Sequence, residues 1–301
     1  MSELALSVAC QGYDRVRALF DGRVRIEGCR ANFLPLGPEE AFFRAFRHGE
    51  FDVSELSFSS YLMTLDRGDP EYVALPVFPS RMFRHSAIYV RSDRGITAPK
   101  DLKGRTVGVP EYQVTAAVWV RGMLQDEYGV QPSELRWRSG GLEEPGREEK
   151  LPLALPASIE LQPIPAGKTL SRMLEEGEID ALVAPRAPSC FARGAAGVAR
   201  LFPDFRAVEQ AYFAKTGLFP IMHVIGIRRR LCDAHPWLAA SVAKAFAEAK
   251  AFALRELSDV TALAASLPWL PAEVEDTRRR MGADWWPYGV DANRRTLETL
   301  T

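Results

Sequence analysis

The chain has 301 residues, of which 47% are hydrophobic and 26% are charged, and its formal net charge is −1. This composition is typical of a globular protein long enough for two lobes. A nearly neutral chain without a basic stripe gives no electrostatic reason to expect nucleic acid or an acidic membrane as a partner. No apolar run approaches the ~18 residues that span a bilayer.

The four cysteines are far apart in the sequence and form no CxxC pair. They are expected to be buried free thiols in a reducing compartment, since no local signature of a catalytic cysteine surrounds them. Residues 1–10 end in Cys10 like a lipoprotein signal, but their apolar stretch has only seven residues and follows an acid instead of a base. We therefore expect a first strand there and a cytoplasmic protein.

The first 80 residues alternate between expected strands and helices. Helix 38–48 is indicated by a proline and two acids in its first turn. The expected strands are 4–9, 31–36, the start of 51–61, and 72–77. The other expected helices are 15–20 and the one into which 51–61 runs, which continues to about residue 66. A β-α-β-α-β order of this length predicts a doubly wound lobe.

The apolar run 87–90 predicts a buried strand, and the polar segment 91–104 predicts a crossing into a second lobe. Expected strands of that lobe are 106–109, 135–138, 159–164 and 179–184; its expected helices are 114–128 and 169–176. Residues 139–157 are rich in glycine, glutamate and proline, and predict a surface loop. Strand 219–227 is expected to cross back, followed by a long helix over 236–257 and by residues 268–290, which pack on the first lobe.

This order predicts an α/β fold, a bilobal clamshell of two doubly wound lobes with two interlobe crossings. Lobe 1 would comprise residues 1–90 and 223–301, and lobe 2 residues 91–222. Ligands in such folds bind where the carboxyl ends of strands meet, so we expect a ligand cleft between the lobes.

Arg81, Arg84 and His85 directly precede the strand 87–90. Arginine matches a carboxylate with a two-pronged set of donors, so this cluster predicts anchors for an anionic ligand. The structural alternative is that the arginines form interlobe salt bridges. His85 could exchange a proton near neutral pH.

The segment 110–115 predicts a second anion site, because a turn into a helix presents free backbone N–H groups. Thr115 adds a hydroxyl, and Tyr112 and Gln113 could contact ring substituents. Glu111 would either accept a proton from a phenol or form a salt bridge to an arginine. The alternative for the whole segment is a simple strand-to-helix turn.

The remaining candidates follow other expected strands. His223 lies in an apolar strand, where it is either a hydrogen-bonded core residue or a catalytic one. Further candidate binding residues are Ser57, Ser59, Tyr13, Asp14 and Arg186, with helix capping as the alternative for the serines. No metal motif, GxGxxG or P-loop is present, so we expect no metal and no cofactor. A site formed by His85, His223 and Glu111 is the one metal-binding alternative.

Several long motifs of this chain resemble those of the 4,5-dihydroxyphthalate decarboxylases, a family with a type II periplasmic-binding-protein-like fold. They are FDVSELSFSSYL (51–62), PVFPSRMFRHSAIYVR (76–91), KDLKGRTVGVPEYQVTAAVWVRGMLQDEYGV (100–130), GGLEEPGR (140–147), LFPD (201–204), GLFPIMH (217–223) and DWWPYGV (284–290). The resemblance covers nearly the whole chain and implies a C-terminal tail beyond Thr301.

The resemblance implies decarboxylation of 4,5-dihydroxyphthalate to 3,4-dihydroxybenzoate without a cofactor. Arg81, Arg84 and Arg186 would anchor the carboxylates. His85 or His223 would donate a proton to the ring, and Glu111 or the other histidine would act as the base. The rival hypothesis is a non-catalytic protein that binds or senses an aromatic acid, and a third is an enzyme for another hydroxylated aromatic acid. The expected partner is a small aromatic carboxylate, and a homo-oligomer is left open.

Overall fold

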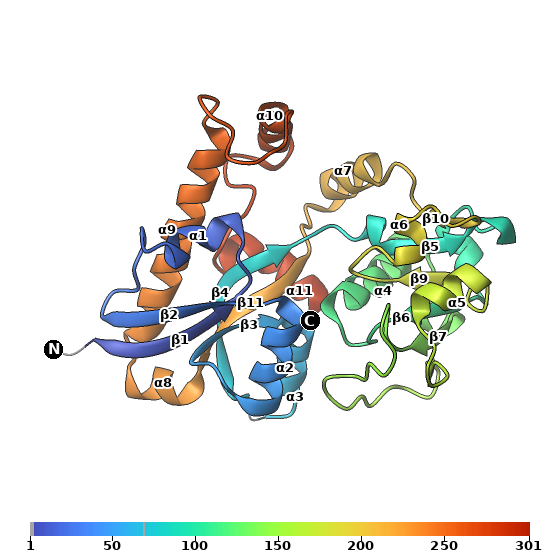
Figure 1. Ribbon diagram of the computed structural model, residues 1–301, viewed down its shortest axis with the longest axis horizontal. Helices are drawn as coiled ribbons and strands as arrows, with labels where there is room; N and C mark the ends of the chain where they lie inside the picture. Colours follow the sequence, from blue (N-terminus) through green and yellow to red (C-terminus); the bar gives the residue numbers. More distant parts are fainter. Residues whose placement is uncertain (1–2, 69) are drawn as a thin grey trace. The chain divides into compact units, whose positions relative to one another are not determined.

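Two β-sheets, each in its own unit, organise the computed structural model, which describes residues 3–68 and 70–301 (Figure 1). Unit 1 comprises the chain up to Arg81 together with Ile221–Thr299, and unit 2 is the intervening segment Met82–Pro220. The α/β class with one unit inserted in the other is the organisation predicted from the sequence.

Unit 1 holds a five-stranded sheet in the order β2-β1-β3-β11-β4. Its elements are β1 (Leu4–Cys10), α1 (Asp14–Phe20), β2 (Cys29–Pro35), α2 (Pro38–His48), β3 (Val53–Ser57), α3 (Phe58–Asp66), β4 (Tyr72–Arg81), β11 (Ile221–Arg228), α8 (Arg229–Ala234), α9 (Leu238–Ser258), α10 (Leu270–Met281) and α11 (Arg294–Leu300). β1 runs parallel to β2 and β3, whereas β11 is antiparallel to both β3 and β4. The carboxyl ends of β1, β3 and β4 therefore lie at the same edge as the start of β11.

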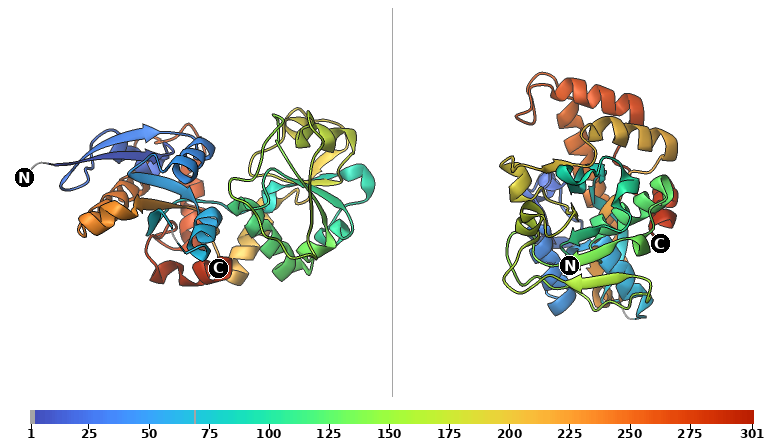
Figure 2. Two further views of the ribbon diagram at one scale, coloured as in Figure 1. Left: turned by 90° about the horizontal axis from the view of Figure 1, so that it is seen from below. Right: turned by 90° about the vertical axis from the view of Figure 1, so that its right-hand side faces the viewer.

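Local sequence explains these elements. Helix α2 begins with Pro38 and two acids, carries Arg47 and His48 in its last turn, and ends at Gly49, whose φ of 53° suits a residue without a side chain. Helices α1 and α9 lie side by side and bury their apolar stripes against the sheet (Figure 1). Figure 2 shows β1 and β2 paired along their whole length at the edge of this sheet.

Unit 2 holds a six-stranded sheet in the order β10-β5-β9-β6-β7-β8. Its elements are β5 (Ile88–Arg91), β6 (Thr106–Val109), α4 (Thr115–Tyr128), β7 (Arg136–Ser139), β8 (Glu160–Pro163), α5 (Leu170–Glu176), β9 (Ala181–Val183), α6 (Ser189–Ala192), β10 (Val198–Arg200) and α7 (Phe205–Thr216). The sequence did not predict α6, β10 or α7. No helix among the described residues is both long and apolar enough to cross a membrane.

The predicted first boundary between the lobes, after residue 90, is wrong by nine residues, because the chain enters unit 2 after Arg81. Strand β5 pairs with β9 and β10 and so belongs to the second sheet. The polar segment 91–104 is part of unit 2 and is not a crossing. The predicted return at 222/223 lies two residues from the observed one, at 220/221.

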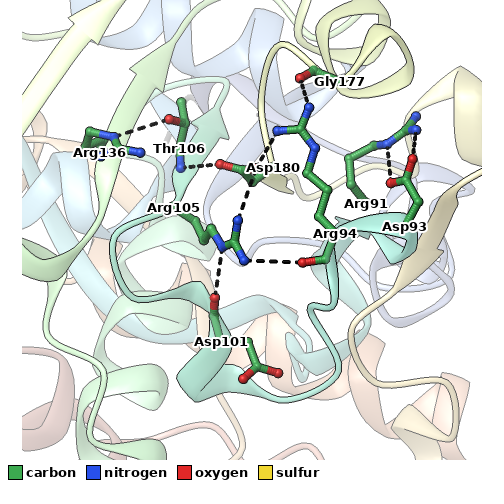
Figure 3. A network of polar contacts seen from close by, with 9 residues as sticks. All are labelled: Arg91, Asp93, Arg94, Asp101, Arg105, Thr106, Arg136, Gly177 and Asp180. Atoms are coloured by element: carbon green, nitrogen blue, oxygen red, sulfur yellow. Dashed lines mark hydrogen bonds and ion pairs between the residues drawn. The ribbon is translucent and has the colours of Figure 1, made fainter.

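Figure 3 shows what the polar segment does. Asp180, directly before β9, accepts hydrogen bonds from the Arg94 guanidinium at 2.7 Å and from the backbone N–H of Thr106 at 2.9 Å. The Arg105 guanidinium lies 3.9 Å from the same carboxylate. Arg94 of the segment and Arg105, which follows it, thus bind the amino-terminal edge of β6 and β9, which explains why this stretch is polar although it belongs to a folded unit.

Candidate functional site

A histidine and a glutamate meet across two neighbouring strands of unit 1. His223 lies near the start of β11 and Glu55 in β3, with 2.6 Å between Nδ1 of the histidine and Oε1 of the carboxylate. In the antiparallel register His223 is opposite Ser57 and Ile225 is opposite Glu55, so both polar side chains lie on the same face. The Glu55 side chain is fully buried, whereas 15% of the His223 side chain is exposed. His223 is therefore the member of the pair that a ligand can reach.

The Glu55 carboxylate accepts further hydrogen bonds from the end of β1 and from the turn that follows it. Oε1 accepts from the Tyr13 hydroxyl at 2.8 Å, while Oε2 accepts from the backbone N–H of Gln11 at 2.9 Å and from the Cys10 thiol at 3.4 Å. The parallel register causes this arrangement, because the two residues before Cys10 pair with the two before Glu55.

These contacts decide the protonation of the cluster. Burial acts to raise the pKa of Glu55, but hydrogen bonds from His223, Gln11 and Tyr13 hold that pKa below its ordinary value. Burial and the neighbouring Glu55 charge raise the pKa of both the Cys10 thiol and the Tyr13 phenol. The carboxylate is thus ionised at neutral pH and surrounded by donors, and Nδ1 of the imidazole faces it.

An aromatic ring packs against the imidazole of His223. The Phe42 ring, from α2, meets the His223 ring edge-on at 4.7 Å between centroids. Of the other residues predicted at this edge, Ser57 and Ser59 are buried, and the Ser57 hydroxyl lies 3.3 Å from that of Ser60. Asp14, the first residue of α1, forms an ion pair at 3.0 Å with its neighbour Arg15. Tyr13 therefore belongs to the Glu55 cluster through its hydroxyl, whereas the Asp14 carboxylate is paired with Arg15.

Next to His223, β4 bulges away from regular pairing. Between the pairs His223–Ser80 and Ile225–Leu75, β4 contributes residues 76–79 against a single residue of β11. Two of the four are prolines, which cannot donate to the ladder. The freed carbonyls of this segment are bound by the Gly289 N–H at 2.8 Å, the Trp286 indole N–H at 2.9 Å and the Arg15 guanidinium.

Arg81 ends β4 and binds the same C-terminal segment. Its guanidinium donates to the carbonyl of Pro287 at 2.7 Å and to the side-chain oxygen of Asn293. Asn293 in turn donates to the carbonyls of Pro287 and Gly289 at 3.0 and 2.8 Å. Burial lowers the pKa of Arg81 to about 10, so the side chain stays charged at neutral pH. The predicted substrate anchor thus holds the segment 287–293 in place.

In unit 2, Glu111 has cationic partners that the sequence analysis had left open. Its carboxylate accepts from Lys150 Nζ at 2.6 and 2.7 Å, and from the Arg147 guanidinium at 2.8 and 2.5 Å. Glu111 and Lys150 are both buried. Of the two alternatives, the structure has the salt bridge to an arginine, with a lysine in addition, and these contacts argue against Glu111 as a base.

The backbone N–H groups predicted to bind a ligand carboxylate are bound by a carboxylate of the chain itself. The N–H groups of Tyr112 and Gln113 donate to Glu149, the latter at 3.2 Å. The Gln113 side chain donates to Glu149 at 2.9 Å and to the carbonyl of Leu151 at 2.8 Å. The Tyr112 ring packs against Trp137 in the core, with 5.4 Å between centroids, and Thr115 begins α4 as a buried residue.

His85 is enclosed in the core of unit 2. Only 1% of the residue is exposed, and rings of Tyr212, Phe202 and Tyr128 surround it at centroid distances of 5.2, 5.3 and 6.5 Å. Within the described part of the chain neither ring nitrogen has a hydrogen-bond partner, and Oε1 of Glu209 lies 4.0 Å from Nδ1. Burial lowers the pKa of His85 to about 4, so the imidazole is neutral. This is the environment of a core histidine.

The two other predicted anchors, Arg84 and Arg186, belong to unit 2 and lie near the end of β9. Arg84 is buried, with Nη1 3.5 Å from the carbonyl of Pro185. Arg186 is the residue after Pro185 and is exposed. The predicted catalytic set is divided by the fold: His223 belongs to unit 1, whereas His85 and Glu111 belong to unit 2.

Comparison with known proteins identifies the family. The chain is 49% identical over 298 residues, 99% of its length and 90% of the relative, to a 4,5-dihydroxyphthalate decarboxylase of Comamonas testosteroni. It is 51% identical over 204 residues, 68% of this chain and 79% of the relative, to a 4,5-dihydroxyphthalate decarboxylase of Pseudomonas putida. The chain belongs to the 4,5-dihydroxyphthalate decarboxylase family.

The fold of this decarboxylase family member is that of periplasmic binding proteins. Residues 13–143 match the family model of the phosphonate periplasmic substrate-binding protein of ABC transporters. The aliphatic sulphonate binding protein of Escherichia coli, 15% identical, aligns over 99% of this chain and 91% of its own with a TM-score of 0.52. A protein of Archaeoglobus fulgidus, 14% identical, aligns over 98% and 95% with a TM-score of 0.54. The type II binding-protein-like fold that we predicted is confirmed.

Sequence reasoning missed four residues that make the key contacts of this decarboxylase family member: Glu55, Arg147, Glu149 and Lys150. Glu55 carried one usable signal, an acid inside a run of buried strand residues, because a buried carboxylate needs donors. In the described ranges no group of three or more histidine, cysteine, aspartate or glutamate side chains could hold a metal ion.

Proposed function

We propose that this protein catalyses the non-oxidative decarboxylation of 4,5-dihydroxyphthalate to 3,4-dihydroxybenzoate and CO2, a carbon–carbon lyase reaction of aromatic catabolism. The relatives named for this activity support the enzyme over a non-catalytic solute-binding protein. The structural observation that carries the proposal is the His223–Glu55 pair, in which a partly exposed imidazole is backed by a buried carboxylate.

The substrate's own chemistry sets the requirements. Each carboxylate of 4,5-dihydroxyphthalate has a hydroxyl para to it on the ring. Loss of the phenolic proton pushes electron density onto the carbon that bears the carboxylate, and a proton delivered to that carbon forms the new C–H bond. The C–C bond then breaks, CO2 leaves, and its bonding pair restores the aromatic ring. A base takes the phenolic proton and returns it to the oxygen once the ring is aromatic again. The net reaction therefore consumes one proton and needs no oxidant, and it requires a base at the phenol, a proton donor at the ring carbon and carboxylate anchors.

We assign the proton donor to His223, because it is the candidate histidine with a partly exposed side chain and a hydrogen-bonded partner. His85 is buried among aromatic rings, and Glu111 is paired with Lys150 and Arg147, so both are better suited to stabilise unit 2. Arg84 and Arg186 are retained in the proposal as carboxylate anchors. A cytoplasmic location is also retained, and cell fractionation tests it. The oligomeric state, which the sequence left open, is determined by light scattering.

The purified protein is incubated with 4,5-dihydroxyphthalate without added metal, and 3,4-dihydroxybenzoate is quantified by chromatography together with released CO2. Turnover is expected for the wild type. His223→Gln is expected to lower kcat about 10²–10⁴-fold, the usual contribution of a general acid. His48→Gln is the matched control, since His48 is exposed at the end of α2. A raised melting temperature without turnover would favour the binding-protein alternative.

A further inference from the structure

The two carboxylate oxygens of Glu55 have different sets of partners. Oε1 accepts hydrogen bonds from both the Tyr13 hydroxyl and Nδ1 of His223, at 2.8 and 2.6 Å. Oε2 accepts from the backbone N–H of Gln11 and from the Cys10 thiol. The bonds to Oε2 are fixed by the backbone at the end of β1, so the carboxylate cannot rotate without breaking them. Oε1 is consequently held at one position, against the imidazole.

A carboxylate held in this way determines which imidazole nitrogen carries the hydrogen. An ionised carboxylate can only accept, so the nitrogen facing Oε1 must be an N–H. The Tyr13 hydroxyl and the Gln11 N–H supply donors to the charge, which lets a fully buried Glu55 remain ionised. The second imidazole nitrogen, Nε2, is then the one that gains and loses a proton during a reaction.

We propose that Glu55 and Tyr13 are positioning residues of the decarboxylation. Glu55 keeps the hydrogen of neutral His223 on Nδ1, so that Nε2 is the nitrogen that takes up a proton, forms the imidazolium and delivers that proton to the ring carbon, and Tyr13 keeps Glu55 in place and charged. Neither residue contacts the reacting atoms in this scheme. Tyr13 was predicted from the sequence as a binding residue, and the proposal gives it another task, because its hydroxyl is committed to Glu55. The inference rests on the proposed function for its kinetic part only.

The first test is a spectroscopic one that needs no substrate. Protein labelled with ¹⁵N-histidine is titrated by NMR, and the His223 signals are assigned with His223→Gln. We expect the Nδ1–H tautomer of neutral His223 in the wild type. In Glu55→Gln, an isosteric but uncharged replacement, a mixture of tautomers is expected, because the amide can present either its oxygen or its NH2 group to Nδ1. A wild-type spectrum dominated by the Nε2–H tautomer would overturn the proposal.

The second test is kinetic. Glu55→Gln is expected to lower kcat about 10²–10³-fold with KM changed less than threefold, because ground-state binding does not involve Glu55. Tyr13→Phe removes one donor from the carboxylate and is expected to lower kcat about threefold to tenfold. It should also move the acid limb of the pH–rate profile to higher pH, since an ion with one donor fewer is protonated more easily. Tyr13→Phe removes a single oxygen atom and keeps the test valid if Glu55→Gln does not fold.

The matched control is Asp52→Asn, three residues before Glu55. Asp52 accepts from the N–H and hydroxyl of Ser7, both at 3.0 Å, at the opposite end of the same pair of strands. The Asp52→Asn substitution should leave kcat and the His223 tautomer unchanged. If the wild type turns over substrate and Glu55→Gln keeps its kcat, the positioning role is wrong. If the wild type shows the Nδ1–H tautomer but no turnover, the proposed function fails while the assigned geometry stands.

Discussion

Glu111 and Lys150 lie 39 residues apart in the sequence and form a buried ion pair, with 2.6 and 2.7 Å between Nζ and the two carboxylate oxygens. Arg147 binds the same carboxylate. Three charges gathered in this way stabilise one another only as a set, because loss of one member leaves a buried charge without compensation. These ion pairs support a structural role for Glu111 and argue against the catalytic role that the sequence suggested.

Glu111→Gln is therefore expected to reduce the free energy of unfolding by about 3 kcal/mol, since Lys150 would remain buried without a counter-charge. Urea denaturation followed by circular dichroism measures the change. The double variant Glu111→Gln/Lys150→Met should recover part of the loss, because it removes both charges. A Glu111→Gln protein of wild-type stability with strongly reduced kcat would instead support the catalytic base of the sequence-based hypothesis.

His85→Leu tests the burial of a neutral imidazole. The pKa of His85 is about 4 in the folded protein and ~6.5 when unfolded, so the unfolded state binds more protons between these values. Wild-type stability should fall as the pH drops from 6.5 towards 4, by up to about 2–3 kcal/mol from this residue. His85→Leu should lose this part of the pH dependence and keep kcat. An unchanged pH dependence, or a large loss of kcat, would contradict the core role.

Asp180→Asn probes the network drawn in Figure 3. Burial acts to raise the pKa of Asp180, but the Thr106 N–H and the Arg94 guanidinium hold it below its ordinary value. A lowered pKa means that the carboxylate stabilises the fold above the unfolded value of ~3.9, and that this contribution is lost as the pH falls through the folded value. The variant should be about 1–3 kcal/mol less stable at pH 7 and converge on the wild type in acid.

The matched control for that variant is Asp93→Asn in the same segment, where the exposed Asp93 pairs with Arg91. Because water screens this pair, its stability curve should overlay that of the wild type at every pH. Equal losses for the two variants would show that burial at β6 and β9 does not govern the strength of the network.

Asn293→Ala should release the C-terminal segment from β4. The substitution removes one acceptor of Arg81 and the amide group that donates to Pro287 and Gly289, whereas Arg81 keeps its bond to the carbonyl of Pro287. We expect a loss of about 2–3 kcal/mol in the free energy of unfolding and faster amide exchange over 284–290. Hydrogen-exchange mass spectrometry locates the change, and uniform exchange throughout unit 1 would contradict a local effect.

The sequence predicted the sheet of unit 1 well, because β1, β4 and β11 are largely apolar runs. It placed His223 in an apolar strand and left its role open between core and catalysis. Its partner could not be predicted, since the contact depends on the register of β11 against β3, 168 residues apart. A strand pattern gives the face of a residue but not the neighbour across the sheet.

The loop 139–157 shows a second limit of prediction from the sequence, which concerns the contacts of a loop. Its composition predicts a loop, and between β7 and β8 the structure has neither helix nor strand. Glycine and proline mark the absence of regular structure, but they give no hint that Arg147, Glu149 and Lys150 bind the turn before α4. Long-range pairs of charges carry no periodic signal in the sequence, so the organisation of this loop could not be predicted.

The contacts of this loop are reciprocal: Glu111 of the turn is bound by cations of the loop, and Glu149 of the loop is bound by N–H groups of the turn. Residues 147–151 thus share their stability with α4 although they lack secondary structure. A protease that cleaves surface loops should spare this stretch until unit 2 itself unfolds. Salt should leave this protection largely in place, because buried charge pairs are screened by ions much less than exposed ones.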